Sequence, residues 1–424
     1  MVGEKFMRRL FLPALFFAVS CTPLSAQTVQ TIALSSQDKN FSWPQFLVIN
    51  DDLAFVVGSD TKNIAVVDLD ASTVVRLIPL REDMEPYRID ISPQGRVAVS
   101  GSKYVALFDT ARLLADPQAP VDVSIVCVID CSRPKPTAST AAIAFPPGAE
   151  LPIMSALDRA RGTGAIYKVL PDQAENLLNS LSGNNDEAYK LFGFDVPGEF
   201  YTGIRAYSLP ADVLSLTEGA PAQEIVIPAD KDNAAPAIRL VEIAMVGDAE
   251  GMAVLPDGQH ALIVDQDDSM VRSVDLSSGK VVAERHVGIP HLQYPFPQVP
   301  FSGDTMDLVL SADGGTAFAS NIRSNSIVKL DAQNLSISDI YHLPGKEGGP
   351  YGISLSPNGR YVLAAGWGSD TLFVTDIATG AVSVSAVGRR PVDVAVDSKG
   401  RAVVTNSEDA TLSVVTFTGI DLLR

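Results

Sequence analysis

The sequence predicts an all-β protein with the architecture of a β-propeller, and three observations support this prediction. One unit recurs along the chain, its segments are short and apolar, and glycine-containing turns separate them. In three copies the turn glycine and the aspartate that ends the third segment are 17 residues apart: Gly258 and Asp275, Gly314 and Asp331, Gly359 and Asp376. Segments of four to seven residues rich in Val, Ile, Leu and Ala, bounded by Pro-Asp-Gly or Pro-Asn-Gly turns, are typical of β-strands.

Each unit contains four such segments, and a four-stranded twisted sheet cannot bury both of its faces alone. Successive sheets therefore stack face to face, and closure into a ring leaves only short, protected edges. The copies start near residues 45, 86, 139, 250, 304, 350 and 391, which predicts seven blades. Eight blades are the alternative, because residues 139–247 are long enough for two degenerate copies. The last copy supplies three strands and ends near Phe417, so we expect residues 28–34 to complete it and close the ring.

The first 26 residues are typical of a secretory signal peptide. Lys5, Arg8 and Arg9 precede an apolar run over residues 10–19, and small residues follow up to Ala26. This run is too short to span a bilayer. We therefore expect cleavage after Ala26, a single propeller domain over residues 27–424, and a periplasmic or secreted location. The alternative is a lipid anchor at Cys21, where residues 18–21 loosely match a lipoprotein cleavage box.

Charge and cysteine content narrow the classes of partner. The formal net charge is −18, which repels phosphate backbones and argues against nucleic acid. Cys127 and Cys131 are the cysteines that remain after cleavage, and in an oxidising compartment we expect them to form a disulfide. The histidines have no ligand-like spacing, so we expect no metal and no cofactor; they are His260, His286, His291 and His342.

Several segments resemble one known family, the YVTN-type (YncE-like) seven-bladed propellers of exported bacterial and archaeal proteins. The best match is Val-Val-Thr-Asn-Ser-Glu-Asp-Ala-Thr-Leu-Ser-Val-Val at 403–415, and weaker matches lie at 55–68 and 318–331. The resemblance covers residues 40–127 and 247–418. It implies the fold, an exported location and a role in binding or assembly, while the ligand differs between members of such a family.

Four insertions interrupt the repeat, at residues 128–139, 158–198, 228–247 and 288–303. Residues 172–181 within the second are the one credible helix. If residues 158–198 join the second and third strands of their blade and the other three lead from one blade to the next, all four project from one face of the ring. That face is the candidate binding surface. Tyr294, Phe296 and Phe301 suit contact with a partner protein, and a lid packed on its own propeller is the alternative.

A second set of candidates is expected to converge on the central channel. Polar and aromatic side chains at the starts of first strands, or after second strands, could hold a small ligand or a loop of a partner. The alternative is that they are merely solvated. These residues are Trp43, Tyr87, Arg88, Asp267, Arg323, Tyr351, Trp367 and Asp393.

The aspartates at the ends of third strands have a simpler explanation than metal binding. Each lies in a different blade, so we expect each carboxylate to accept hydrogen bonds from backbone amides of the turn that follows. They are Asp68, Asp109, Asp275, Asp331 and Asp376.

Taken together, these patterns favour an exported, non-enzymatic propeller that binds a protein partner or a small ligand through its insertion-bearing face and central channel. One alternative is a propeller-type lactonase or hydrolase, which would need convergent metal ligands or a general base with a shifted pKa. The other is an accessory subunit of a periplasmic redox enzyme, although the chain has no Cys-x-x-Cys-His haem motif.

Overall fold

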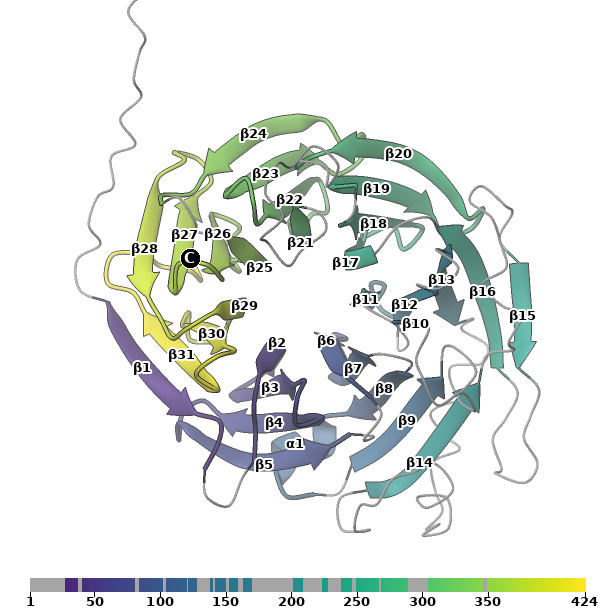
Figure 1. Cartoon of the computed structure of the whole chain (residues 1–424), viewed down its shortest axis with the longest axis horizontal. Coiled ribbons are helices and arrows are strands. Elements are labelled where there is room, and N and C mark those ends of the chain that lie inside the picture. Colours follow the sequence, from purple (N-terminus) through teal and green to yellow (C-terminus); the bar gives the residue numbers. More distant parts are fainter. Residues whose placement is uncertain are drawn as a thin grey trace, which may run out of the picture.

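The computed structural model shows a ring of sheets around a central axis (Figure 1). The structure describes residues 27–36, 40–80, 84–101, 104–119, 121–127, 138–139, 142–149, 152–158, 163–169, 201–208, 223–227, 238–245, 249–266, 268–288, 304–345 and 349–424. The prediction of an all-β β-propeller is confirmed.

Seven sheets account for the strands in this described part of the chain. Five of them have four strands, and the first consists of β2 (Pro44–Asn50), β3 (Leu53–Gly58), β4 (Asn63–Asp68) and β5 (Thr73–Pro79). The next three follow one another along the chain: β17 (Ala249–Val254), β18 (His260–Asp265), β19 (Met270–Asp275) and β20 (Lys280–His286); β21 (Thr305–Leu310), β22 (Thr316–Asn321), β23 (Ser326–Asp331) and β24 (Ile337–His342); and β25 (Pro350–Leu355), β26 (Tyr361–Gly366), β27 (Thr371–Asp376) and β28 (Val382–Ala386). The fifth joins β29 (Pro391–Val396), β30 (Ala402–Asn406) and β31 (Thr411–Thr416) to β1 (Thr28–Ala33) from the other end of the chain.

The two remaining sheets are larger. One contains β6 (Pro86–Ile91), β7 (Arg96–Gly101), β8 (Tyr104–Asp109), β9 (Val121–Cys127) and β14 (Tyr201–Ser208). The other contains β10 (Ala138–Ser139), β11 (Ile143–Ala144), β12 (Ile153–Asp158), β13 (Thr163–Val169), β15 (Gln223–Ile227) and β16 (Ile238–Met245). A short helix that the sequence did not suggest, α1 (Ala111–Ala115), connects β8 to β9.

The first strand of each repeat lies nearest the axis (Figure 1). β2, β6, β17, β21, β25 and β29 begin within one residue of the copy starts read from the sequence. The cores lie between neighbouring sheets, as in the cluster that joins Phe318 of β22 to Phe373 of β27. Both faces of the second strands are therefore buried, and β3 is buried at all six positions. This explains why second strands such as β3 and β26 are continuously apolar instead of alternating.

The turns confirm the expected role of the strand-end aspartates. Oδ1 of Asp376 accepts hydrogen bonds from the backbone N–H groups of Ala378 and Thr379, at 3.0 and 3.1 Å. The other four aspartates accept from turn amides in the same way: Asp68, Asp109, Asp275 and Asp331. These carboxylates therefore stabilise the turns, and their positions are explained without a metal ion.

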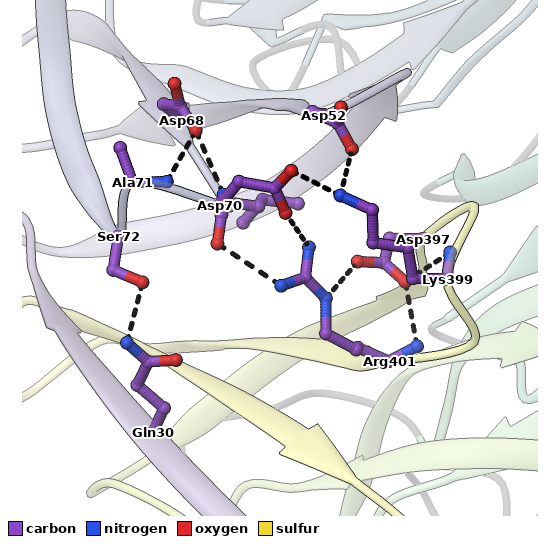
Figure 2. A network of polar contacts seen from close by, with 10 residues as sticks. Gln30, Asp52, Asp68, Asp70, Ala71, Ser72, Asp397, Lys399 and Arg401 are labelled. Carbon is purple, nitrogen blue, oxygen red and sulfur yellow. Dashed lines mark hydrogen bonds and ion pairs between the residues drawn. The ribbon is translucent and has the colours of Figure 1, made fainter.

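The first and last repeats of the chain meet at one seam. β1 pairs antiparallel with β31, with Ile32 opposite Leu412. Beside it, ion pairs link the turn after β29 to the sheet of β2–β5 (Figure 2): Lys399 contacts Asp52 and Asp70, and Arg401 contacts Asp70 at 3.1 Å. These pairs are largely exposed, so they contribute less to stability than the apolar contacts of β1.

Two insertions are not connected as the sequence suggested. β12 and β13 are the second and third strands of their sheet, and both precede residue 170, so the long segment that carries β14 and β15 follows the third strand. In addition, β16 occupies most of residues 238–247 within the insertion 228–247. Because neighbouring strands are antiparallel, a connection from a third to a fourth strand leaves the ring on the opposite side from a connection to the next blade. The prediction that all four insertions project from one face is therefore wrong.

The segment after β13 instead contributes to two sheets. β14 pairs in parallel with β9 at the edge of the preceding sheet, and β15 pairs antiparallel with β16. Both additions lie at the outer rim of the ring (Figure 1). They cover strand edges that would otherwise be open to pairing with another chain.

Several predictions fall outside the described residues. They concern the signal peptide and Cys21, the pairing of Cys127 with Cys131, the helix at 172–181, Asp267, and the contact residues Tyr294, Phe296 and Phe301. In the part of the chain that is described, no helix has the length and apolar character required to cross a membrane.

Candidate functional site

The starts of the first strands are distorted in a way that turns side chains toward the axis. In each of β2, β6, β17, β21, β25 and β29 the pairing with the second strand shifts register within the first residues. A bulge of this kind bends the strand and re-aims its side chains. The residues at these positions therefore meet, although they come from different repeats.

A buried ion pair spans the ring at this level. Nη1 of Arg88 on β6 lies 2.7 Å from Oδ1 of Asp307 on β21, and Nη2 donates to the carbonyl oxygen of Met306 at 2.9 Å. β6 and β21 lie on opposite sides of the axis (Figure 1). The guanidinium carbon also lies 4.0 Å from the centre of the Phe46 ring, a cation–π contact that adds to the pair.

Two tyrosines complete this layer. The hydroxyl oxygens of Tyr87 and Tyr351 are 2.5 Å apart, and the ring of Phe46 lies edge-on to Tyr87 with centroids 5.4 Å apart. We call this cluster the axial plug; it consists of Phe46, Tyr87, Arg88, Asp307 and Tyr351. The plug fills the axis on the side where the first strands begin, which we call the start face.

Burial dominates the electrostatics of the plug. Burial opposes the charge of Arg88, but Asp307, Tyr87 and Glu250 together outweigh it, so the pKa of Arg88 is raised and the side chain stays protonated. Burial, together with the nearby carboxylate of Glu250, also raises the pKa of Tyr87 and of Tyr351. Both tyrosines are therefore neutral at physiological pH, and one hydroxyl donates to the other.

A cavity of about 480 Å³ extends along the axis from the plug toward the ends of the first strands. Small residues line its middle level and leave room there: Ala253, Ser354 and Ala395. Larger aliphatic residues of five sheets line its far end while also packing against the cores between sheets: Ile49, Ile91, Leu310, Leu355 and Val396. The plug closes the other end through Phe46, Arg88 and Asp307.

Two carboxylates line this cavity without a guanidinium partner of their own. Asp393 is 7 % exposed, and its Oδ2 accepts from the backbone N–H of Leu47 at 3.0 Å. Asp90 is half-buried at the middle level, and its Oδ2 accepts from the N–H of Phe145 at 2.8 Å. Burial raises the pKa of Asp90 to about 6. Burial and repulsion by Asp307 raise the pKa of Asp393 to about 7.

The structure brings together part of the residue set predicted from the sequence. Tyr87, Arg88, Tyr351 and Asp393 converge on the axis, and Trp367 packs against the same apolar cluster. Trp43 precedes β2, where its carbonyl accepts from the N–H of Ser59. Arg323 donates its backbone N–H to Asp304 at 2.6 Å. Neither Trp43 nor Arg323 lines the cavity. A ligand-binding role for each of these residues stays a prediction.

Sequence reasoning missed three members of the site, namely Phe46, Asp90 and Asp307. The signal that could have found two of them is the repeat register. Phe46 and Asp307 occupy the third position of their first strands, as Arg88 and Asp393 do. Asp90 lies two residues after Arg88, so it shares the side of β6 from which Arg88 projects.

Comparison with known proteins supports the class of fold and nothing finer. No family model matches the sequence, and no curated protein matches it. A streptogramin B lyase structure aligns with a TM-score of 0.52 and 11 % identity, covering 92 % of this chain and 98 % of that one. The β-propeller domain of Cps50 (Swd1) from Myceliophteria thermophila aligns with a TM-score of 0.56 and 11 % identity, covering 93 % and 100 %. The protein is a β-propeller.

Proposed function

We propose that this protein is a non-enzymatic β-propeller that binds a small organic molecule in its central cavity. The observation that carries the proposal is the cavity itself, which at about 480 Å³ falls within the range of about 300–1,000 Å³ found for small-molecule sites. Most of the wall that the cavity exposes is polar, and aliphatic residues near the ends of the first strands supply the rest. This composition suits a small ligand that joins a polar group to a short apolar part.

The finer description of the fold belongs to the same proposal. We infer a ring of seven blades in which β1 serves as the outer strand of the last blade, supported by the sheets and by the pairing of β1 with β31. The segments at 55–68, 318–331 and 403–415 support kinship with YVTN-type propellers, and residues 1–26 support export to the periplasm or the medium. The likeness to a lyase at 11 % identity concerns the fold, and we assign no catalytic activity from it.

Small-molecule capture compares the wild-type protein with Ser354→Phe and Ser383→Phe. Immobilised mature protein is incubated with a metabolite extract of its natural host, and the bound metabolites are identified by mass spectrometry. We expect the wild type to retain a metabolite and Ser354→Phe to lose it, because a phenyl ring at residue 354 enters the cavity. Ser383 lies at comparable burial on β28 of the same sheet, so Ser383→Phe should retain the metabolite. Retention by Ser354→Phe would contradict the proposal, as would the absence of any metabolite on the wild type.

A further inference from the structure

The charges on the cavity wall are unbalanced. Among the described residues that line it, Arg88 is the single basic one, and it faces three carboxylates, those of Asp90, Asp307 and Asp393. Asp307 neutralises the charge of Arg88 in an ion pair with a contact of 2.7 Å. The remaining wall is therefore negative whenever Asp90 and Asp393 are ionised.

These two carboxylates also retain unused capacity to accept hydrogen bonds. A carboxylate offers about four lone-pair positions, and the bonds from Leu47 to Asp393 and from Phe145 to Asp90 each occupy one. A further backbone N–H reaches each carboxylate, from Val394 and Ile91 respectively. Asp90 is the more exposed of the two, and it stands at the level where small residues widen the cavity.

We propose that the occupant of the cavity is a small organic amine, with its ammonium group at Asp90 and its apolar body among the aliphatic side chains at the far end. This inference rests on the proposed function, because it names the class of ligand for the same site. An ammonium group restores the charge balance of the wall and donates the hydrogen bonds that the carboxylates can still accept. An anion would face repulsion from the same groups.

The raised pKa values of the carboxylates give the proposal a pH signature. Desolvation leaves Asp90 and Asp393 partly protonated near neutral pH, at pKa values of about 6 and 7. The neighbouring charges are those of Arg88 and Asp307, and Arg88 stays protonated throughout the range. Only the ionised carboxylates attract a cation, so affinity for an amine should rise between pH 5 and pH 8, with release of protons on binding.

A metal ion bound by these carboxylates is less well supported than an amine. The described residues contain no group of three or more His, Cys, Asp or Glu side chains placed to hold a metal. The oxygens of Asp90 and Asp393 that accept backbone N–H groups are also partly withdrawn from coordination. Titration with Ca²⁺ alone is therefore included in the test.

The test uses three probes of one shape that differ in charge: phenethylamine, 2-phenylethanol and phenylacetate. Their affinities for the mature protein are measured by isothermal titration calorimetry at pH 7.5. We expect phenethylamine to bind at least about tenfold tighter than 2-phenylethanol, an advantage of one close charge-assisted contact, and phenylacetate to bind most weakly. Asp90→Asn keeps an oxygen that can accept from Phe145, so it should reduce phenethylamine to the affinity of 2-phenylethanol and leave 2-phenylethanol unchanged.

The outcomes separate this inference from the proposed function. Equal binding of all three probes to the wild type, lost in Ser354→Phe, would overturn the amine and preserve the ligand-binding cavity. Binding of none of them, with no metabolite captured on the wild type, would overturn both. Ca²⁺ binding that Asp90→Asn abolishes, without phenethylamine binding, would replace the amine by a metal. If Asp90→Asn is unstable by thermal unfolding, Asp393→Asn takes its place and should reduce the preference for the amine in the same direction.

Discussion

Arg88→Met is expected to lower the free energy of unfolding by about 3–5 kcal/mol, the typical effect of removing one partner of a buried ion pair. Asp307 would then keep a buried charge with no guanidinium beside it, and the contacts of Arg88 with Met306 and Phe46 would be lost. Because the pair joins opposite sides of the ring, the loss should appear as one cooperative change in urea unfolding. Circular dichroism at equilibrium measures it.

Two further variants show whether this loss comes from the buried charge. Asp307→Asn removes the charge but keeps an oxygen for the N–H of Ile353, which now donates to Asp307 at 3.1 Å. The double variant Arg88→Met/Asp307→Asn should therefore be more stable than Arg88→Met alone. Arg389→Met breaks surface pairs with Glu408 and Asp409, and it should change stability little. A double variant no more stable than Arg88→Met would show that the packing of Arg88, and not its charge, holds the plug.

Ile32→Ala should destabilise the protein by about 2–5 kcal/mol, the usual cost of truncating a buried Ile to Ala. Ile32 is 2 % exposed and belongs to a core that includes Leu47 and Leu412, which come from the first and last repeats. Val29 lies on the same strand but is 41 % exposed, so Val29→Ala should change the free energy of unfolding by no more than about 0.5 kcal/mol. Urea unfolding of the two variants makes the comparison. If Ile32→Ala is as mild as Val29→Ala, β1 does not hold the seam.

The repeat made most of the fold predictable, because every copy carries its own strand, turn and aspartate signals. The turn aspartates show this well, since each is satisfied by amides two or three residues away, as at Asp376. Local sequence also predicted that Tyr87, Arg88, Tyr351 and Asp393 share the axis, because they hold equivalent positions near the starts of first strands.

Features that depend on distant residues could not be read in the same way. Arg88 and Asp307 are 219 positions apart, and their contact follows from the closure of the ring. The pairing of β14 with β9 is similar, because the chain has to return to a sheet that it has already left. The cavity arises because the bulged starts of the first strands fill the axis at one level while small residues such as Ser354 and Ala395 leave it open at the next. No single repeat contains that information.

A crystal structure of the protein with phenethylamine shows whether the axial cavity holds an amine at Asp90. We expect electron density for the phenyl ring among Ile49, Ile91 and Leu355, with the nitrogen about 3 Å from a carboxylate oxygen of Asp90. Phenethylamine bound only on the outer surface, with the cavity occupied by water alone, would show that Asp90 does not hold an amine.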